Sequence, residues 1–143
     1  MKLFLKNHLL LIIFFQSLIA MLGSLYFSDV LHYTPCVLCW YQRICLYPLV
    51  IISIIGYFRN DKHVSWYILP LSIIGLIINV YQNLLYYKII PEAIAPCQNG
   101  VSCTTQYINW LGFITIPLLS GITFLSIICC MIMYQKLNKE KDE

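Results

Sequence analysis

Long apolar stretches without charged residues make up most of this sequence. They lie between Lys6 and Asp29, between Arg43 and Arg59, between Lys62 and Lys88, and from about residue 108 to 134. A bilayer core about 30 Å thick needs roughly 20 apolar residues in a helix that rises 1.5 Å per residue. The pattern therefore predicts four membrane-spanning helices.

The expected spans cover about residues 8–27, 39–58, 66–87 and 110–134, with outer loops at about 28–38 and 88–109. Residues 44–58 alone are too few to cross a bilayer, so the second helix is expected to begin at Cys39. The composition agrees, since 60% of residues are hydrophobic and 10% are charged, against about 25% charged in soluble domains. We therefore expect an all-α membrane protein: one domain over residues 1–143, folded as an antiparallel four-helix bundle.

Basic residues set the expected orientation, because cytoplasmic flanks carry most Lys and Arg. One side holds Lys2, Lys6, Arg59, Lys62, Lys136, Lys139 and Lys141, and the other holds Arg43 and Lys88. Both termini are thus predicted to be cytoplasmic and the two outer loops extracytoplasmic. The net charge of +3 reflects these flanks, and nothing in the sequence points to nucleic acid.

An alternative for the amino terminus is a cleaved signal peptide, because Lys2 and Lys6 precede an apolar run. That run is about twice as long as the apolar region of an ordinary signal peptide. A membrane span is therefore the favoured interpretation.

Two cysteine pairs lie on the predicted outer side of the membrane. Cys36 and Cys39 form a CxxC motif, which places two sulfurs about one helical turn apart, and Cys97 and Cys103 form a second pair. Such spacing lets a disulfide open and close without rearrangement of the backbone, and the extracytoplasmic side is the oxidising one. The two pairs together predict electron transfer through thiols.

Arg43 lies four residues after Cys39, on the same helix face. It is suited to stabilise a thiolate at Cys39 or an anionic electron acceptor beside it. The alternative is that Arg43 extends to the lipid headgroups, as arginines near span ends often do. The chain has no pattern for haem, flavin or dinucleotide binding, so elimination favours a lipid-soluble quinone as the acceptor.

Polar residues are few inside the spans. Asn79, Gln82 and Asn83 cluster toward the outer end of the third span, where such residues normally face the bundle or an aqueous pocket.

Residues 35–43, Pro-Cys-Val-Leu-Cys-Trp-Tyr-Gln-Arg, resemble the signature of the DsbB family of disulfide bond formation proteins. Residues 110–117, Trp-Leu-Gly-Phe-Ile-Thr-Ile-Pro, resemble the start of the last span in the shorter, BdbC-type branch of that family. The resemblance covers nearly the whole chain. It implies a multi-pass thiol-disulfide oxidoreductase of the bacterial cell membrane, which supports disulfide formation in exported proteins.

The resemblance also implies partners and cofactors. The protein partner would be a secreted or membrane-anchored thioredoxin-like thiol oxidase of the DsbA or BdbD type. The electron acceptor would be menaquinone or ubiquinone, with no metal. Arg43 matches the quinone-side arginine of the family, and Gln42 beside it is a further candidate for quinone binding.

The same resemblance implies two redox-active disulfides, Cys36 with Cys39 and Cys97 with Cys103. Cys97 would take the attack of the partner, and Cys103 would exchange with the first pair through a bond to Cys36. Cys39 would then be the thiolate that meets the quinone. The gap between Cys97 and Cys103 is shorter than in the best-known DsbB proteins, which leaves the order of attack within that pair open.

Three other readings of the four outer cysteines stay open. The disulfides are possible staples of a membrane scaffold, four thiolates are enough to bind zinc, and quinone-linked enzymes of the vitamin K epoxide reductase type also join a CxxC to a loop pair. In that last class the loop pair precedes the CxxC, whereas here it follows. Cys45, Cys129 and Cys130 are expected to be packing residues.

Overall fold

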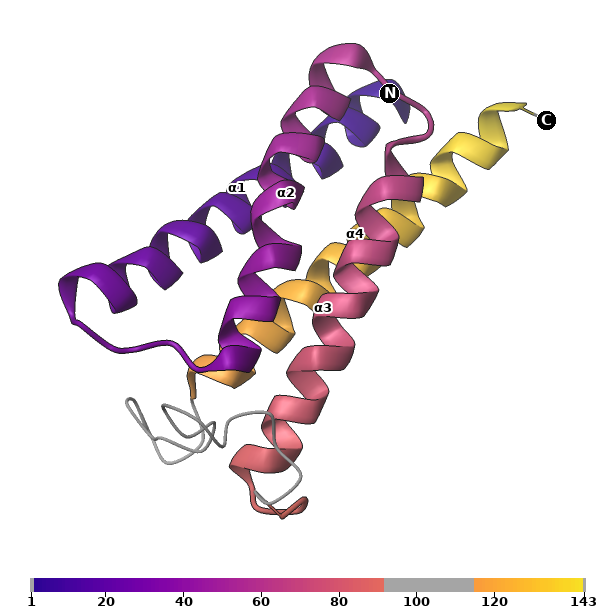
Figure 1. The fold of residues 1–143 in the computed structure, drawn as a ribbon. Coiled ribbons are helices and arrows are strands. Elements are labelled where there is room, and N and C mark those ends of the chain that lie inside the picture. The colour runs from indigo at the N-terminus through magenta and orange to yellow at the C-terminus, as the bar shows by residue number, and fades with distance from the viewer. Residues whose placement is uncertain (1, 92–114, 143) are drawn as a thin grey trace.

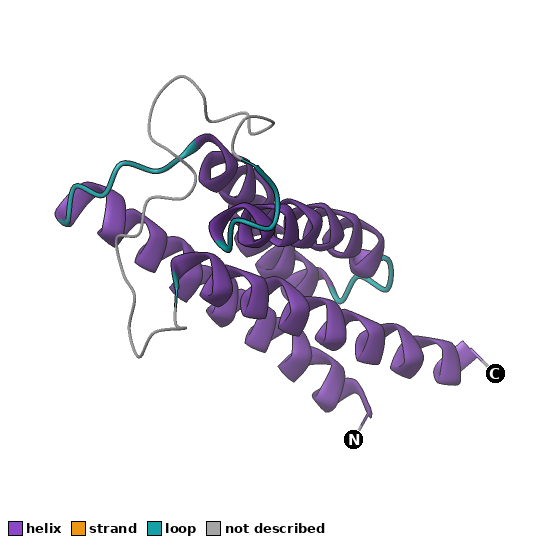
Figure 2. Cartoon of the chain, turned by 90° about the horizontal axis from the view of Figure 1, so that it is seen from below, coloured by secondary structure: helices purple, strands orange, loops and turns teal. Residues whose placement is uncertain are grey.

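Helices form all the regular structure described for this protein (Figure 2). The computed structural model describes residues 2–91 and 115–142, with side chains for 6–91 and 115–139. The helices are α1 (Lys2–Leu25), the short π-helix η1 (Tyr26–Val30), α2 (Val37–Arg59), α3 (Val64–Tyr86) and α4 (Ile116–Asp142). The predicted all-α fold is thereby confirmed.

The four long helices form an antiparallel bundle (Figure 1). Both chain ends lie at one end of the bundle, while α2 begins, α3 ends and α4 begins at the other. Each long helix contains a segment long and apolar enough to cross a membrane, and large apolar side chains such as Phe15, Ile51, Ile77 and Ile122 are exposed on the outside. This surface suits lipid, so the protein is a multi-pass membrane protein.

The second helix begins two residues earlier than predicted. Cys36 is its N-cap, with extended backbone angles (φ −72°, ψ 169°), and its sulfur accepts a hydrogen bond of 3.4 Å from the backbone N–H of Cys39. This bond satisfies one of the donors that every helix start leaves unpaired. The Cys36 sulfur thus belongs to the helix end rather than to a loop before it.

The fourth helix begins, in the described part of the chain, at Ile116. The hydroxyl of Thr115 accepts a 3.3 Å hydrogen bond from the backbone N–H of Leu118, and Pro117 occupies the first turn, where its missing N–H costs nothing. The expected start at residue 110 falls outside the described residues. Toward the other terminus the helix continues to Asp142, beyond the predicted end of the span at residue 134.

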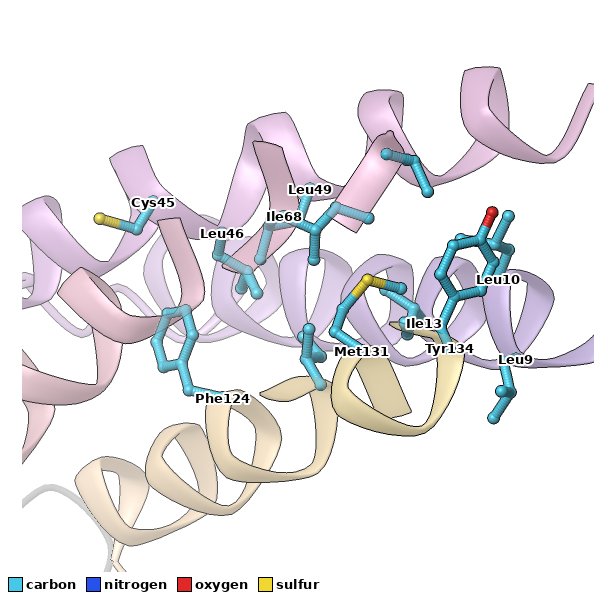
Figure 3. Close-up of a cluster of buried hydrophobic side chains, with 12 residues drawn as sticks. Leu9, Leu10, Ile13, Cys45, Leu46, Leu49, Ile68, Phe124, Met131 and Tyr134 are labelled. Atoms are coloured by element: carbon cyan, nitrogen blue, oxygen red, sulfur yellow. The ribbon is translucent and has the colours of Figure 1, made fainter. Parts of the chain in front are cut away.

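An apolar core extends from the end of the bundle that holds the termini past its middle, and all four long helices contribute to it (Figure 3). Its members are Leu9, Leu10, Ile13, Cys45, Leu46, Leu49, Val64, Ile68, Phe124, Ile127, Met131 and Tyr134. Gly75 lets α3 approach α4, because a Cβ there would collide with the ring of Phe124. The buried amides of the bundle gather at the opposite half, beside the cysteines.

Candidate active site

Cys36 and Cys39 face each other at the amino-terminal end of α2. Their sulfurs lie 2.9 Å apart, within hydrogen-bonding distance, so formation of a disulfide bond of about 2.05 Å needs only a small approach. Cys36 is buried and Cys39 is half-buried. The hydrogen bond with Cys39, together with burial, raises the pKa of the Cys36 thiol above its ordinary value. The Cys36 thiol therefore loses its proton less readily than an ordinary cysteine.

Gln82, from α3, contacts both sulfurs. Its side-chain Nε2 donates to the Cys39 sulfur at 3.2 Å and lies 3.5 Å from the Cys36 sulfur. The predicted polar cluster of the third span thus does face the interior of the bundle, with Asn79 and Gln82 both buried. One of its amides touches the candidate redox atoms.

A second layer of polar side chains lies behind Gln82. Gln42 donates from Nε2 to the Gln82 Oε1 at 2.5 Å, and its own Oε1 accepts a 2.8 Å hydrogen bond from the Ser120 hydroxyl of α4. Asn79 donates to Ser120 at 2.6 Å and to the carbonyl of Pro117 at 2.7 Å. Polar groups from α2, α3 and α4 therefore meet beside the cysteines.

Arg43 lies inside the bundle rather than at the headgroups. It is 9% exposed, its Nε donates to the Ser24 hydroxyl at 2.7 Å, and its Nη2 donates to the Ser24 carbonyl at 2.8 Å. Its guanidinium also lies over the ring of Trp40, 5.4 Å from the centroid. The remaining nitrogen, Nη1, has no hydrogen-bond partner among the described residues. Interaction with the headgroups, the alternative left open by the sequence, does not describe this geometry.

A cavity of about 330 Å³ adjoins these groups. Cys36, Cys39, Gln42, Arg43 and Gln82 all line it. Its other walls come from α1, η1, the loop between η1 and α2, α3 and α4, and include Gly23, Phe27, Tyr33, Tyr86 and Leu119. Its volume lies within the range of about 300–1,000 Å³ typical of small-molecule sites.

A groove on the outer surface of the bundle meets this cavity. It runs along α1 from His8, has a volume of about 570 Å³, and includes the exposed side chains of Ile12 and Phe15. Ile19, Ala20 and Thr123 line both the groove and the cavity. The cavity beside the cysteines therefore borders this groove on the outer surface between α1 and α4.

Cys97 and Cys103, the second predicted redox pair, lie outside the described residues. The structure therefore does not test their pairing or their roles. Of the remaining cysteines, Cys45 lies in the apolar core, Cys130 packs against that core, and Cys129 is exposed on α4. No metal-binding group of three His, Cys, Asp or Glu side chains occurs within residues 2–91 and 115–142. The zinc alternative depended on Cys97 and Cys103, so it stays untested.

Two serines in the site have roles that the sequence did not reveal. Ser24 anchors Arg43, and Ser120 holds Gln42 in place. A polar residue within a membrane span often indicates that its side chain binds another polar group inside the bundle. Serine gives little such indication, however, because small residues are ordinary at helix contacts within membranes.

Known proteins similar to this chain also point to disulfide chemistry. The family profile of "Disulfide bond formation protein DsbB" matches residues 6–134. The chain belongs to the DsbB family. Membership makes it a thiol-disulfide oxidoreductase of the membrane, as the sequence predicted.

Individual relatives place the chain in the short branch of the DsbB family. It is 50% identical over 127 residues to Disulfide bond formation protein C of Bacillus subtilis, covering 89% of this chain and 90% of that protein. It is 47% identical over 117 residues to Probable disulfide formation protein C of Halalkalibacterium halodurans, covering 82% and 85% of the two chains. No solved structure matches this chain.

Proposed function

We propose that this DsbB-family protein oxidises an extracytoplasmic thioredoxin-like dithiol protein and passes the electrons to a membrane quinone. One observation carries the proposal: the Cys36 and Cys39 sulfurs and the buried cation of Arg43 line one cavity, and this cavity shares three wall residues with a groove on the outer surface of the bundle. A quinone dissolves in lipid and accepts two electrons, which is the number that closure of one disulfide releases.

The cavity offers suitable partners for a quinone ring. Nη1 of Arg43 is available to donate to a quinone carbonyl, and it strengthens that bond with its charge. Phe27 and Tyr33, stacked with ring centroids 6.4 Å apart and nearly parallel, supply a flat apolar wall. The groove along α1 suits the apolar tail. Gln42 lines the same cavity, and its contact with the quinone stays a prediction.

Cys39 is the sulfur that faces the acceptor in this proposal. It is the more exposed of the pair and it lines the cavity, whereas Cys36 caps the helix and packs against Leu38 and Leu85. Attack on Cys36 by an outer-loop thiol would break the bond between Cys36 and Cys39 and leave Cys39 as the thiolate. Once the other outer-loop thiol has released Cys36, the Cys36 and Cys39 sulfurs close their disulfide again, and two electrons pass through Cys39 to the quinone.

The whole cycle balances without another reactant. The partner dithiol loses two electrons and two protons and becomes a disulfide, and the quinone gains both and becomes a quinol. Between them, Cys97 exchanges with the partner, and Cys103 exchanges with Cys36. Cys97 then closes its bond with Cys103 and frees Cys36, and the quinone oxidises Cys36 and Cys39, which restores both disulfides of this chain. The roles of Cys97 and Cys103 come from the family resemblance.

The cysteine end of the bundle faces the outside of the bacterial cell membrane in this proposal. The chain termini, with most of the Lys and Arg residues, lie at the opposite end (Figure 1). Both termini can be cytoplasmic, as predicted, only if they lie at the same end of the bundle, and this arrangement meets that condition. The thiol pairs would then work where cytoplasmic reductants are absent.

Anaerobic quinone reduction by the purified protein tests the proposal. The protein in detergent is supplied with menaquinone or ubiquinone and a reduced thioredoxin-like oxidase, and the Cys39→Ser and Cys97→Ser variants are compared with it. We expect turnover in the wild type and none in either variant, while Cys39→Ser still forms a mixed disulfide with the partner through Cys97. Equal quinone reduction by wild type and Cys39→Ser would contradict the proposal.

A further inference from the structure

An unbroken series of hydrogen bonds crosses three helices and ends on the cysteine sulfurs. Asn79 donates to the Ser120 hydroxyl, Ser120 donates to Gln42, Gln42 donates to Gln82, and Gln82 donates to Cys39. Every donor in this series points toward the sulfurs. Hydrogen bonds aligned in one direction polarise one another, so each strengthens the next.

Burial protects the series from water. Gln42, Asn79 and Gln82 are all buried, so few water molecules compete for their amides. The Oε1 of Gln82 accepts from Gln42, and this leaves its Nε2, a donor only, to face the sulfurs. The opposite orientation would place two amide N–H groups against each other and an oxygen against the thiolate. The Ser120 hydroxyl lies 2.8 Å from Gln42 Oε1 and 3.0 Å from the Pro117 carbonyl, and it favours this orientation of Gln42 when it donates to Gln42. Gln42 in turn favours the Gln82 orientation that presents Nε2.

A donor aimed at a sulfur favours one redox state over the other. A thiolate accepts a much stronger hydrogen bond than a disulfide sulfur, because the bond to an ionised acceptor is charge-assisted. The cavity and the lipid around the site exclude much of the water that would otherwise solvate the thiolate. The N–H of Gln82 thus stabilises the reduced pair more than the oxidised pair.

We infer that Gln82 is a further residue of the active site, which makes the Cys36–Cys39 disulfide a stronger oxidant, and that Gln42 and Ser120 act by positioning it. This inference rests on the proposed function, in which Cys36 and Cys39 form a redox-active disulfide. Loss of the donor makes the pair harder to reduce. Electron entry from the outer-loop cysteines then becomes less favourable, while delivery to the quinone becomes more favourable.

Equilibration with glutathione measures this effect directly. Two glutathione thiols reduce the disulfide, giving the two cysteine thiols and one glutathione disulfide, so atoms and electrons balance. The full-length chain carries Cys97→Ala and Cys103→Ala, so that neither outer-loop thiol exchanges with the first pair. After an acid quench, the free thiols are alkylated and the peptide containing Cys36 and Cys39 is quantified by mass spectrometry.

Gln82→Leu is expected to shift the equilibrium constant about tenfold toward the disulfide, which corresponds to about 30 mV for a two-electron couple. Ser120→Ala is expected to shift it in the same direction by a smaller factor, because it only loosens Gln42. Ser120→Ala removes a single oxygen, so it also serves if Gln82→Leu does not fold.

Gln16→Leu is the matched control. Gln16 also bridges helices, donating to the Thr123 carbonyl at 3.4 Å and accepting from Ser126 at 3.1 Å, but none of its hydrogen bonds leads to the sulfurs. The equilibrium constant of the Gln16→Leu variant with glutathione should equal that of the parent.

Two outcomes would overturn the inference, and they are distinguishable. If the pair titrates in every variant and neither Gln82→Leu nor Ser120→Ala shifts the constant beyond Gln16→Leu, Gln82 does not set the redox balance and the proposed function stands. If Cys36 and Cys39 form no disulfide in the parent at any glutathione ratio, both the inference and the proposed function fail.

Discussion

Arg43 binds Ser24 through two hydrogen bonds, of 2.7 Å from Nε to the hydroxyl and 2.8 Å from Nη2 to the carbonyl. These bonds join the second turn of α2 to the last turn of α1. The guanidinium is thereby fixed in orientation, and its third nitrogen, Nη1, has no hydrogen-bond partner among the described residues. A charged side chain within a membrane span is costly, so the buried position of Arg43 beside the Cys36 and Cys39 pair argues for a function there.

Arg43→Met should weaken quinone use far more than thiol exchange. Loss of a charge-assisted hydrogen bond removes about 1.5–3 kcal/mol, so the KM for quinone should rise about tenfold or more. The rate of mixed-disulfide formation with a reduced partner should stay within about twofold, since Arg43 makes no contact with the outer-loop cysteines in the proposal. Arg59→Met, at the exposed cytoplasmic end of α2 in the predicted topology, is the control. Equal losses of both activities in Arg43→Met would show that the residue only anchors the helices.

Gly23→Leu should fill the cavity without disturbing the fold. A Cβ at Gly23 meets no atom within 4 Å, and the residue lines the cavity beside Arg43. The leucine side chain is expected to occupy the space of the quinone ring and raise the quinone KM about tenfold or more, an effect of about 1.4 kcal/mol. The melting temperature in detergent should not fall, because glycine is a poor helix former. Gly23→Ala should stay close to wild type in both measurements. An unchanged KM in Gly23→Leu would place the quinone elsewhere.

Alkylation of the reduced protein should distinguish the two thiols. A raised pKa means that Cys36 keeps its proton as the pH rises past the ordinary cysteine value of about 8.5, and only the thiolate reacts. Between pH 6 and pH 9, Cys36 should therefore react with iodoacetamide at least about tenfold more slowly than Cys39, which is also the more exposed. Peptide mass spectrometry after timed labelling gives both rates. Faster labelling at Cys36 would mean that the thiolate lies on the helix-capping sulfur instead.

The fold was accessible from the sequence because lipid imposes a simple rule. Each span must be long, apolar and helical, so the charge-free stretches predict the number and order of the helices. The helix ends were less predictable. Cysteine is not a usual helix cap, and the start of α2 at Val37 depends on the Cys36 sulfur accepting from Cys39.

The candidate site was only partly accessible from the sequence. Spacing along α2 places Arg43 on the face of Cys39, but whether it reaches the headgroups or the interior depends on the position of Ser24 in another helix. The same holds for Gln82, whose polar character predicts an inward orientation but not its contact with the sulfurs. Contacts between helices that are far apart in the chain leave no periodic pattern in the local sequence. They were therefore found only in the structure.

The most direct test of the account is a single turnover between the Cys36 and Cys39 thiols and quinone, without a partner protein. The chain with Cys97→Ala and Cys103→Ala is reduced, freed of reductant and mixed anaerobically with excess menaquinone, and quinol formation and free thiols are followed together. The account predicts about one quinol per protein, with the loss of both thiols and a new disulfide in the peptide that contains them. If Cys36 and Cys39 stay reduced while quinone remains oxidised, with the protein folded and ubiquinone tried as well, transfer of electrons from this pair to quinone is contradicted.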